Sequence, residues 1–174
     1  MMLMWLGSLL VVLVCIDMGI KEYIENSFSE NEERQTRMPK IVLRKVYNRG
    51  LLLNALDRYP GVIRAGSAAS GMGVLLYDAW LLLKKGKWFR KLGMVFVTAG
   101  AVSNIYDRLA RGKVIDYFGV KSKSRFLSDL TANLADIYVT VGAVIITVCD
   151  LGCGRKNKEI GRKRNKKKRN KKKR

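Results

Sequence analysis

The amino-acid sequence predicts an all-α membrane protein with four transmembrane helices and a small extracytoplasmic β-rich segment. Three observations lead to this fold class. Four apolar runs interrupt the 174 residues, and a membrane-spanning helix needs about 20 mostly apolar residues. The 34 Lys and Arg residues, against 14 Asp and Glu, lie mainly between and after these runs. Two short segments between the runs have the β-branched, partly alternating pattern of strands.

Ionisable side chains are rare within the four apolar runs. Runs of this length are too apolar for the core of a soluble domain of this size, so we expect each run to form a transmembrane helix. The predicted helices, with the ionisable residues that they contain, are residues 1–20 with Asp17, 65–83 with Asp78, 92–109 with Asp107 and Arg108, and 132–151 with Asp136 and Asp150.

The first apolar run has two alternative explanations. A secretory signal peptide needs a positively charged start, and no Lys or Arg precedes this run. A lipoprotein signal needs a small residue before its Cys, and here Val14 stands before Cys15. We therefore favour a retained transmembrane helix over either kind of cleaved signal.

Positive charges predict the orientation of the helices. The link between the second and third helices, residues 84–91, carries five Lys and Arg in eight residues, and residues 155–174 carry fourteen. Segments of this kind stay on the cytoplasmic side of a membrane. Both termini are therefore predicted to be cytoplasmic, with residues 21–64 and 108–125 outside.

The C-terminal segment differs in composition from the rest of the chain. Residues 155–174 hold fourteen basic residues and one acid, and such runs are usually disordered and solvated. We therefore divide the chain into a membrane domain, residues 1–154, and a disordered basic cytoplasmic tail. Beside a membrane, the tail is expected to attract anionic lipid head groups. No aromatic residue is interleaved for base stacking, so no nucleic-acid partner is expected.

The composition excludes several kinds of chemistry. The chain has no His, which excludes Ser-His-Asp catalysis, Cys-His catalysis and His-based zinc sites. Its three Cys residues form no Cys-x-x-Cys pair, so thiol redox chemistry and Cys-rich metal sites are not expected. We expect neither a metal nor a cofactor.

Polar side chains are predicted to gather at one depth, just inside the outer membrane boundary. With a rise of 1.5 Å per residue, Asp17 lies about 24 Å from the inner end of the first helix. Asn104, Asp107 and Arg108 fall in the last turn of the third helix, and Asp136 falls in the first turn of the fourth. Intramembrane charges cost roughly 2.5–3.5 kcal/mol and tend to face a bundle interior or a cavity. This convergence makes the cluster a candidate site, although helix ends at a membrane surface also carry such residues.

Two outer segments are predicted to form short strands. Residues 41–47 and 113–118 combine β-branched residues with partial alternation, and they end at the turn signals Asn48-Arg49-Gly50 and Gly119. Asp116 lies in the second of these strands. Its apolar and aromatic neighbours would reduce its solvation and raise its pKa.

Five short motifs combine these polar residues at fixed spacings. They lie at the predicted outer ends of the helices or on the predicted strands. In chain order the motifs are Asp17-x-x-x-Lys21, Asn48-x-Gly50, Gly100-x-x-x-Asn104-x-x-Asp107-Arg108, Gly112-x-Val114-x-Asp116-Tyr117 and Asn133-x-Ala135-Asp136.

Together the motifs resemble those of bacterial lipoprotein signal peptidase, the signal peptidase II family. The resemblance covers residues 17 to about 150, and five motifs in the family's order across four helices are far more specific than one. Some positions depart from the family pattern without removing a catalytic group. The departures are Ile20 in place of a hydroxyl residue, Leu51 to Leu53 in place of a small-small-aromatic run, Ser103 in place of Gly, and Ile137 in place of a small polar residue.

The resemblance implies an aspartic endopeptidase of the bacterial cytoplasmic (inner) membrane, with its active site near the outer leaflet; we expect a monomer. The substrate would be a diacylglyceryl-modified prolipoprotein, cut on the N-terminal side of its lipidated Cys. Carried over by motif, the catalytic dyad is Asp116 and Asp136. Two carboxylates in a low-dielectric site share one proton, so one acts as base and the other as acid. The implied supporting residues are Asp17, Lys21, Asn48, Gly50, Gly100, Asn104, Asp107, Arg108, Asn133 and Ala135.

Two other functions were weighed against the pattern. A non-catalytic four-span adaptor or transporter subunit would use residues such as Asp17 and Lys21 as structural ion pairs. A presenilin-type protease needs a Gly-x-Gly-Asp motif, which the sequence lacks. If the chain is the peptidase, we still expect a structural role for Asp107, which would pair with Arg108 and hold the end of the third helix.

Overall fold

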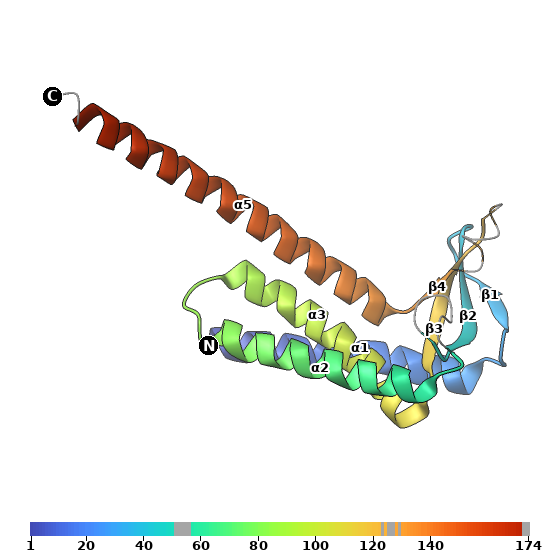
Figure 1. The fold of residues 1–174 in the computed structure, drawn as a ribbon. Helices are drawn as coiled ribbons and strands as arrows, with labels where there is room; N and C mark the ends of the chain where they lie inside the picture. Colours follow the sequence, from blue (N-terminus) through green and yellow to red (C-terminus); the bar gives the residue numbers. More distant parts are fainter. Residues whose placement is uncertain (51–56, 123, 125–127, 129, 172–174) are drawn as a thin grey trace.

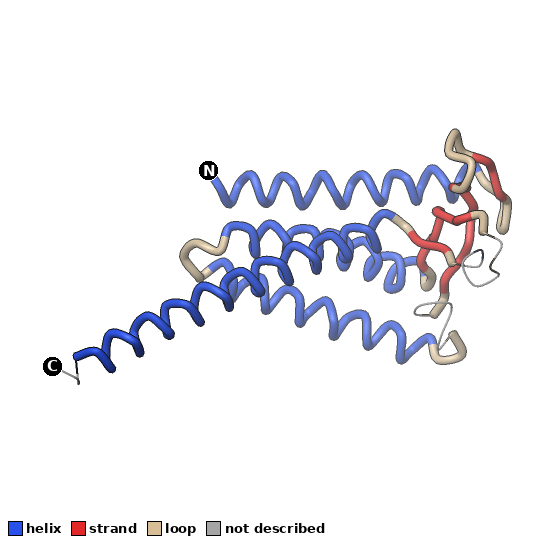
Figure 2. The backbone as a smooth tube through the Cα atoms, turned by 90° about the horizontal axis from the view of Figure 1, so that it is seen from above, coloured by secondary structure: helices blue, strands red, loops and turns tan. Residues whose placement is uncertain are grey.

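Four long helices and a small sheet make up the described part of the chain (Figure 1). The sheet lies at one end of the helical bundle, and the first helix begins and the last helix ends away from it (Figure 2). The chain therefore runs along the bundle four times, as the sequence predicted. The structure, a computed structural model, describes residues 1–50, 57–122, 124, 128 and 130–171, and from residue 153 onward it describes the backbone alone.

Each helix overlaps one of the predicted apolar runs, and two of those described, α1 and α5, are long and apolar enough to cross a membrane. α2 is rich in Gly, Ser and Ala, and α3 carries Arg90 and Lys91 in its first turn, which makes both less apolar. Four helices are thus confirmed, while the spanning of the membrane by α2 and α3 stays a prediction. The bounds are α1 Met2–Ser27, α2 Pro60–Leu82, α3 Trp88–Tyr106 followed by the π-helical turn η2 Asp107–Arg111, and α5 Leu134–Lys171.

Glycines let α3 and α5 pack closely. A Cβ atom on Gly100 would lie well within 3.0 Å of the carbonyl oxygen of Ala135, and one on Gly142 would lie as close to the carbonyl oxygen of Gly93. Neither oxygen can move without displacing a helix backbone. Small residues that allow backbones to approach are typical of helix contacts in membranes, where lipid tails remove the hydrophobic drive between helices. Gly100 therefore acts through the α3–α5 contact.

The sheet has four antiparallel strands in the order β1-β2-β3-β4. The two longer strands, β2 and β3, confirm the two predicted strands to within two residues at each end. The two short strands were not predicted, because two or three residues are too few to show alternation. The bounds are β1 Glu33–Gln35, β2 Ile41–Asn48, β3 Val114–Val120 and β4 Thr131–Ala132.

A small apolar core fixes the sheet to the far end of α1. Ile115 and Tyr117 of β3 pack against Ile24 of α1 and Phe28, which follows α1, and all four side chains are buried. Burial of such side chains is the main stabilising term for a small sheet, which would be marginal alone. The contact places Asp116 of β3 close to the polar residues of α1.

α5 continues without a break through Lys171. The predicted disordered tail begins within this helix, at residue 155, and its disorder stays a prediction. Lys and Arg are good helix formers and the segment contains no Pro, so nothing local ends the helix. Figure 1 shows the last turns of α5 running away from the bundle. The division of the chain at residue 154 stays a prediction.

Candidate active site

The first turn of α5 carries Asp136, one of the two predicted catalytic carboxylates. Asn133 precedes the helix, and its Oδ1 accepts a hydrogen bond from the Asp136 backbone N–H at 3.0 Å. In return, the Asp136 carboxylate accepts a hydrogen bond from the Asn133 backbone N–H at 3.1 Å. This reciprocal pair is a capping box, which satisfies two backbone groups at a helix N-terminus. The motif Asn133-x-Ala135-Asp136 is therefore a helix start that fixes the Asp136 side chain.

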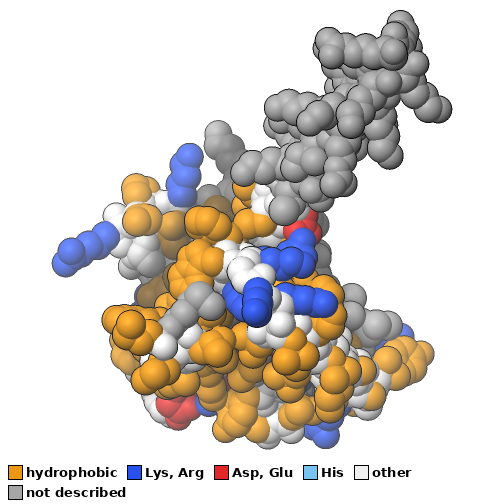
Figure 3. All heavy atoms as spheres, turned by 90° about the vertical axis from the view of Figure 1, so that its left-hand side faces the viewer, with side chains coloured by type: hydrophobic (Ala, Val, Ile, Leu, Met, Phe, Trp, Pro, Cys, Tyr) orange, Lys and Arg blue, Asp and Glu red, His pale blue; other side chains and the backbone are white. Residues whose placement is uncertain are grey.

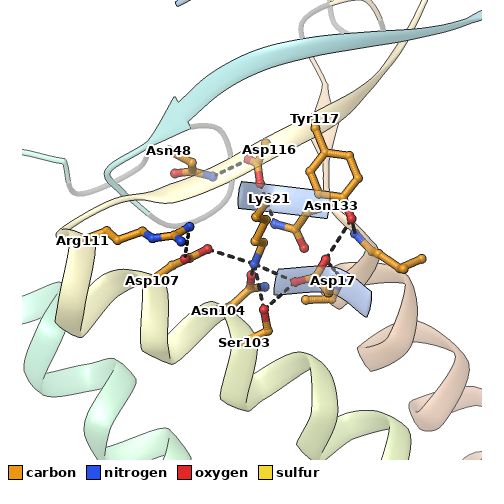
Figure 4. Close-up of polar contacts among 12 residues, drawn as sticks. Asp17, Lys21, Asn48, Ser103, Asn104, Asp107, Arg111, Asp116, Tyr117 and Asn133 are labelled. Carbon is orange, nitrogen blue, oxygen red and sulfur yellow. Dashed lines mark hydrogen bonds and ion pairs between the residues drawn. The ribbon is translucent and has the colours of Figure 1, made fainter. Parts of the chain in front are cut away.

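Asn133 also connects Asp136 with Asp116 of β3. Its Nδ2 donates a hydrogen bond to Asp116 Oδ1 at 2.7 Å (Figure 4). Among the contacts of the described residues, no direct hydrogen bond joins the two carboxylates. The structure thus brings the two predicted catalytic residues together through Asn133, whose side chain bonds to Asp116 and whose backbone N–H bonds to the Asp136 carboxylate.

A turn at the end of β2 holds the other side of Asp116. Asn48 Oδ1 accepts a hydrogen bond from the Gly50 backbone N–H at 3.1 Å, which is the local bond of an Asx-turn. The amide nitrogen of Asn48 is left to donate to Asp116 Oδ2 at 3.2 Å. The Thr131 hydroxyl of β4 lies 3.5 Å from the same oxygen. The Asn48-x-Gly50 motif therefore aims an amide at Asp116.

The surroundings of Asp116 favour its neutral form. The residue is 2% exposed. Burial raises the pKa of the Asp116 carboxyl from 3.8 to about 6, and the negative charge of Asp136 contributes in the same direction. Hydrogen bonds from Asn48 and Asn133 and the charge of Lys21 lower it in part. The direction agrees with that expected from the apolar neighbours of Asp116.

A fully buried lysine, Lys21 of α1, lies behind the dyad. Its Nζ atom forms ion pairs with Asp17 and Asp107, each at 2.9 Å, and all three side chains are inaccessible to solvent. The same nitrogen donates to Ser103 Oγ at 3.1 Å. Asp17 and Lys21 pair with each other and both contact Ser103, because residues four apart lie on one face of a helix. A buried ammonium is stable only with such complete pairing.

Asn104 of α3 joins the buried lysine to the dyad. Lys21 Nζ donates to Asn104 Oδ1 at 2.9 Å (Figure 4). Asn104 Nδ2 in turn donates to Asp136 Oδ1 at 2.9 Å. Because an ammonium can only donate, the lysine fixes which end of the amide faces the carboxylate. Asn104 is thereby oriented as a donor to Asp136.

The predicted pairing of Asp107 with Arg108 is wrong. Asp107 pairs with Lys21 and, at 3.2 Å, with Arg111, which also pairs with Glu22 at 2.7 Å. The π-helical turn η2 widens the end of α3 and is followed by Gly112, whose φ of 72° suits a residue without Cβ. Arg111, one turn further along the chain, therefore pairs with Asp107 in place of the predicted Arg108.

Arg108 lines a cavity of about 390 Å³ between α2, α3 and α5. Gly100 and Asn104 line the same cavity, together with apolar side chains such as Ile63 and Val139. The Nε atom of Arg108 is buried and has no hydrogen-bond partner in the described part of the chain. A buried guanidinium donor without a partner is rare and points to a missing acceptor.

Four residues around the site were not predicted from the sequence: Ser103, Arg111, Tyr117 and Thr131. Ser103 was visible only as a departure from the resemblance, and Tyr117 only as an aromatic position beside Asp116. The described residues contain no group of three or more His, Cys, Asp or Glu that could hold a metal.

Comparisons with known proteins identify the relatives of this chain. A family model described as Signal peptidase (SPase) II matches residues 9–151. The lipoprotein signal peptidase of Sinorhizobium fredii is 32% identical over 152 residues, covering 87% of this chain and 89% of that protein. That of Cupriavidus taiwanensis is 34% identical over 161 residues, covering 89% and 86%. A solved bacterial membrane enzyme, 19% identical, has the same fold with a TM-score of 0.73 over 84% of this chain and 87% of its own.

Fold, site and relatives together define an enzyme of the aspartic peptidase class. The chain belongs to the signal peptidase II family, as the resemblance in its motifs implied. This membership sets aside the non-catalytic adaptor. The ion pairs on which that alternative depended are present at Lys21, but they lie directly behind a pair of carboxylates.

Replacing Asp107 with Asn should reduce both folded yield and activity without abolishing either. Lys21 would keep Asp17 but lose its second carboxylate, at a cost of up to about 3 kcal/mol of stability. Thermal unfolding in detergent, together with the rate of substrate cleavage, checks this. Asp150→Asn is the matched control, because its partial exposure makes the ion pair with Arg90 worth less than about 1 kcal/mol. Complete loss of activity at normal stability would make Asp107 a catalytic candidate instead.

Proposed function

We propose that this protein removes signal peptides from diacylglyceryl-modified prolipoproteins by cutting before the lipidated Cys, with Asp116 and Asp136 as the catalytic dyad. The observation that carries the proposal is the position of Asn133, which bonds to both carboxyl groups while Asp116 is held in surroundings that raise its pKa. Relatives that cover most of this chain bear the name lipoprotein signal peptidase, which supports the substrate class.

The two carboxyl groups differ in a way that suits different roles. Asp136 accepts hydrogen bonds from Asn104 and from the Asn133 backbone, and it lies in the first turn of α5, where the helix dipole favours negative charge. We assign it as the charged base that takes a proton from the attacking water. Asp116 is assigned as the neutral partner that donates a hydrogen bond to the scissile carbonyl oxygen. After water adds, the C–N bond breaks and the leaving amine takes a proton from the pair.

The cavity beside Arg108 suits the peptide that approaches the dyad. Its lining is mostly apolar, as a signal peptide is, and Asn104 connects it to Asp136. The unpartnered Nε of Arg108 is available for a carbonyl oxygen of the substrate backbone. Arg108 therefore has a substrate-orienting role in this mechanism.

Membrane insertion by all four helices places the site near the outer leaflet. The outer surface of the bundle exposes large apolar side chains, which suits contact with lipid. Seen from the end away from the sheet, Lys and Arg side chains gather among hydrophobic ones (Figure 3). This end carries the link between α2 and α3, so it suits the cytoplasmic side, with the sheet and the dyad opposite. Exposed apolar residues include Trp5, Val11, Leu75, Leu76, Val144 and Val148.

The remaining partner assignments follow from charge. With both termini cytoplasmic, the basic segment from residue 155 lies against the inner leaflet and binds anionic head groups at about 1 kcal/mol per basic residue. The membrane domain, residues 1–154, is proposed to act as a monomer in the bacterial inner membrane.

Incubation of the purified protein with a lipidated prolipoprotein tests the proposed activity. We expect cleavage that leaves the lipidated Cys at the new N-terminus and that globomycin, an inhibitor of this family, blocks. The same precursor without its diacylglyceryl group serves as the control and should be cut poorly. Absence of cleavage by folded protein in a lipid environment would refute the proposal.

Cysteine labelling checks the proposed orientation. In a variant without Cys15, Cys149 and Cys153, single Cys residues replace Lys85, in the α2–α3 link, and Ser122, after β3. A membrane-impermeant thiol reagent added to intact cells should label position 122 and not position 85. Lysed cells should show labelling at both positions. Labelling of position 85 in intact cells would contradict the orientation.

A further inference from the structure

One carboxylate oxygen holds the neighbours of both catalytic residues. Asp17 Oδ1 accepts a hydrogen bond from the Tyr117 hydroxyl at 2.9 Å and another from the Ala135 backbone N–H at 3.1 Å. Tyr117 follows Asp116 in the chain, and Ala135 precedes Asp136. The strand and the helix that carry the dyad are thus tied to the same atom of α1.

The Tyr117 hydroxyl makes this connection directly as well. Its oxygen accepts a hydrogen bond from the Leu134 backbone N–H at 3.0 Å (Figure 4). That N–H is one of the groups at a helix N-terminus that lack a partner within the helix. A single phenol therefore bridges β3 to the first residue of α5 and, through Asp17, to α1.

The Asp17 side chain is held in place by contacts to its second carboxylate oxygen as well. Its other oxygen, Oδ2, pairs with Lys21 at 2.9 Å and accepts a hydrogen bond from the Ser103 hydroxyl. Asp17 and Tyr117 are both fully buried. Every oxygen at this junction is engaged, so its geometry is fixed by several elements at once.

We propose that Tyr117 is a positioning residue of the peptidase, whose hydroxyl acts through Asp17 and Leu134 to fix the separation of the Asp116 and Asp136 carboxyl groups. The inference rests on the proposed catalytic function of this dyad. It also gives Ser103 a role, because its hydroxyl holds the oxygen of Asp17 that faces away from Tyr117.

The positioning of the two carboxyl groups depends on the hydroxyl of Tyr117 rather than on its ring. A phenylalanine ring would still pack against Ile24, Phe28 and Ile115. It would leave the Leu134 N–H without its partner and remove one donor from Asp17. The first turn of α5 could then move relative to β3 while the fold persists. Misplacement of catalytic groups by 1 Å can cost about 100-fold in rate.

The test compares Tyr117→Phe with the control Tyr138→Phe. Tyr138 is also a buried tyrosine, and its hydroxyl makes no hydrogen bond among the described contacts. We expect Tyr117→Phe to lower kcat roughly 10- to 100-fold with KM within about twofold, because the effect falls on the reacting groups rather than on substrate binding. Tyr138→Phe should keep both values within about twofold.

The pH profile separates positioning from general loss of structure. Asp136 of α5 and Lys21 of α1 are the charged groups that act on Asp116, and Asp136 raises its pKa. If the pair moves apart, this effect weakens, the pKa of Asp116 falls and the alkaline limb of the pH–rate profile moves to lower pH. An unchanged profile with an unchanged kcat in Tyr117→Phe would overturn the proposal.

Hydrogen exchange gives a readout that does not depend on catalysis. The peptide spanning residues 131–136 should exchange faster in Tyr117→Phe than in the unmodified protein or in Tyr138→Phe. Equal exchange would overturn the positioning role, whether or not the protein cleaves prolipoproteins; an inactive unmodified protein would instead refute the proposed function. If Tyr117→Phe does not fold, Ser103→Ala, which loosens Asp17 from the other side, should show the same loss of kcat and the same faster exchange. Normal values for that variant would then overturn the inference.

Discussion

Replacing either Asp116 or Asp136 with Asn should lower the rate of prolipoprotein cleavage by roughly three orders of magnitude or more. Each carboxyl group has its own task in the proposed mechanism, as proton acceptor or as hydrogen-bond donor to the carbonyl. An amide cannot accept a proton from water at neutral pH, and it is a much weaker acid than a carboxyl group. Neither variant should therefore retain useful activity.

The double variant Asp116→Asn/Asp136→Asn should lose little more activity than either single variant. Residues that act as one unit are strongly non-additive, because removing one already disables the other. Membrane insertion and thermal stability should stay close to normal. Asn keeps one acceptor oxygen, for the Asn133 side-chain amide at position 116 and for the Asn133 backbone N–H at position 136. Asp78→Asn is the matched control: Asp78 is a half-buried carboxylate on α2, bonded to Thr98 and remote from the dyad. Appreciable cleavage by either single variant would contradict the mechanism.

The same pair should give the unmodified enzyme a bell-shaped pH dependence. Only the pair with one proton is active, so activity falls when both groups are protonated and when both are charged. The pKa of Asp116, raised to about 6, places the alkaline limb of kcat/KM near this value, because Asp116 loses its donated proton as the pH rises through it. The two groups are coupled, so this limb is a property of the dyad. A flat kcat/KM between about pH 5 and pH 8 would argue against a shared proton.

Some contacts of the site depend only on local geometry, although of the two below only the ion pair was predicted, as part of the adaptor alternative. Asp17 and Lys21 pair because they lie four residues apart on one helix. Asn133 and Asp136 form a cap because they lie three apart at a helix start. In each case the spacing within one segment determines the contact, so a motif is enough to predict it.

Contacts between distant segments could not be predicted in this way, because spacing within one segment does not determine them. Asp107 pairs with Lys21, 86 positions earlier in the chain, and with Arg111 across a π-helical turn that no spacing rule predicts. Tyr117 looked like one more aromatic residue, because its hydroxyl acquires partners only when β3 meets α5. The charge of the last segment favoured disorder, while its residues also favour helix, and local sequence does not decide between the two.

Gly100→Ala should have the second large effect, although it adds only one methyl group and removes no polar contact. Its Cβ would overlap the carbonyl oxygen of Ala135, which belongs to the backbone of α5 and cannot rotate away. α3 and α5 would have to separate by on the order of 1 Å, enough to cost about 100-fold in rate where catalytic groups are concerned. Asn104 lies one turn beyond Gly100, and Asp136 follows Ala135, so the separation falls on the 2.9 Å hydrogen bond between them.

Gly73→Ala on α2 is the control that isolates this packing effect. A Cβ at Gly73 meets nothing within 4 Å, so the substitution should be neutral or should stabilise α2 by about 0.5–1 kcal/mol through helix propensity. Thermal unfolding and cleavage rate, measured for both variants in the same detergent, should show loss of stability and activity in Gly100→Ala only. Equal behaviour of the two variants would mean that the α3–α5 contact does not position Asn104 against Asp136, because only the methyl group at position 100 meets the backbone of the other helix.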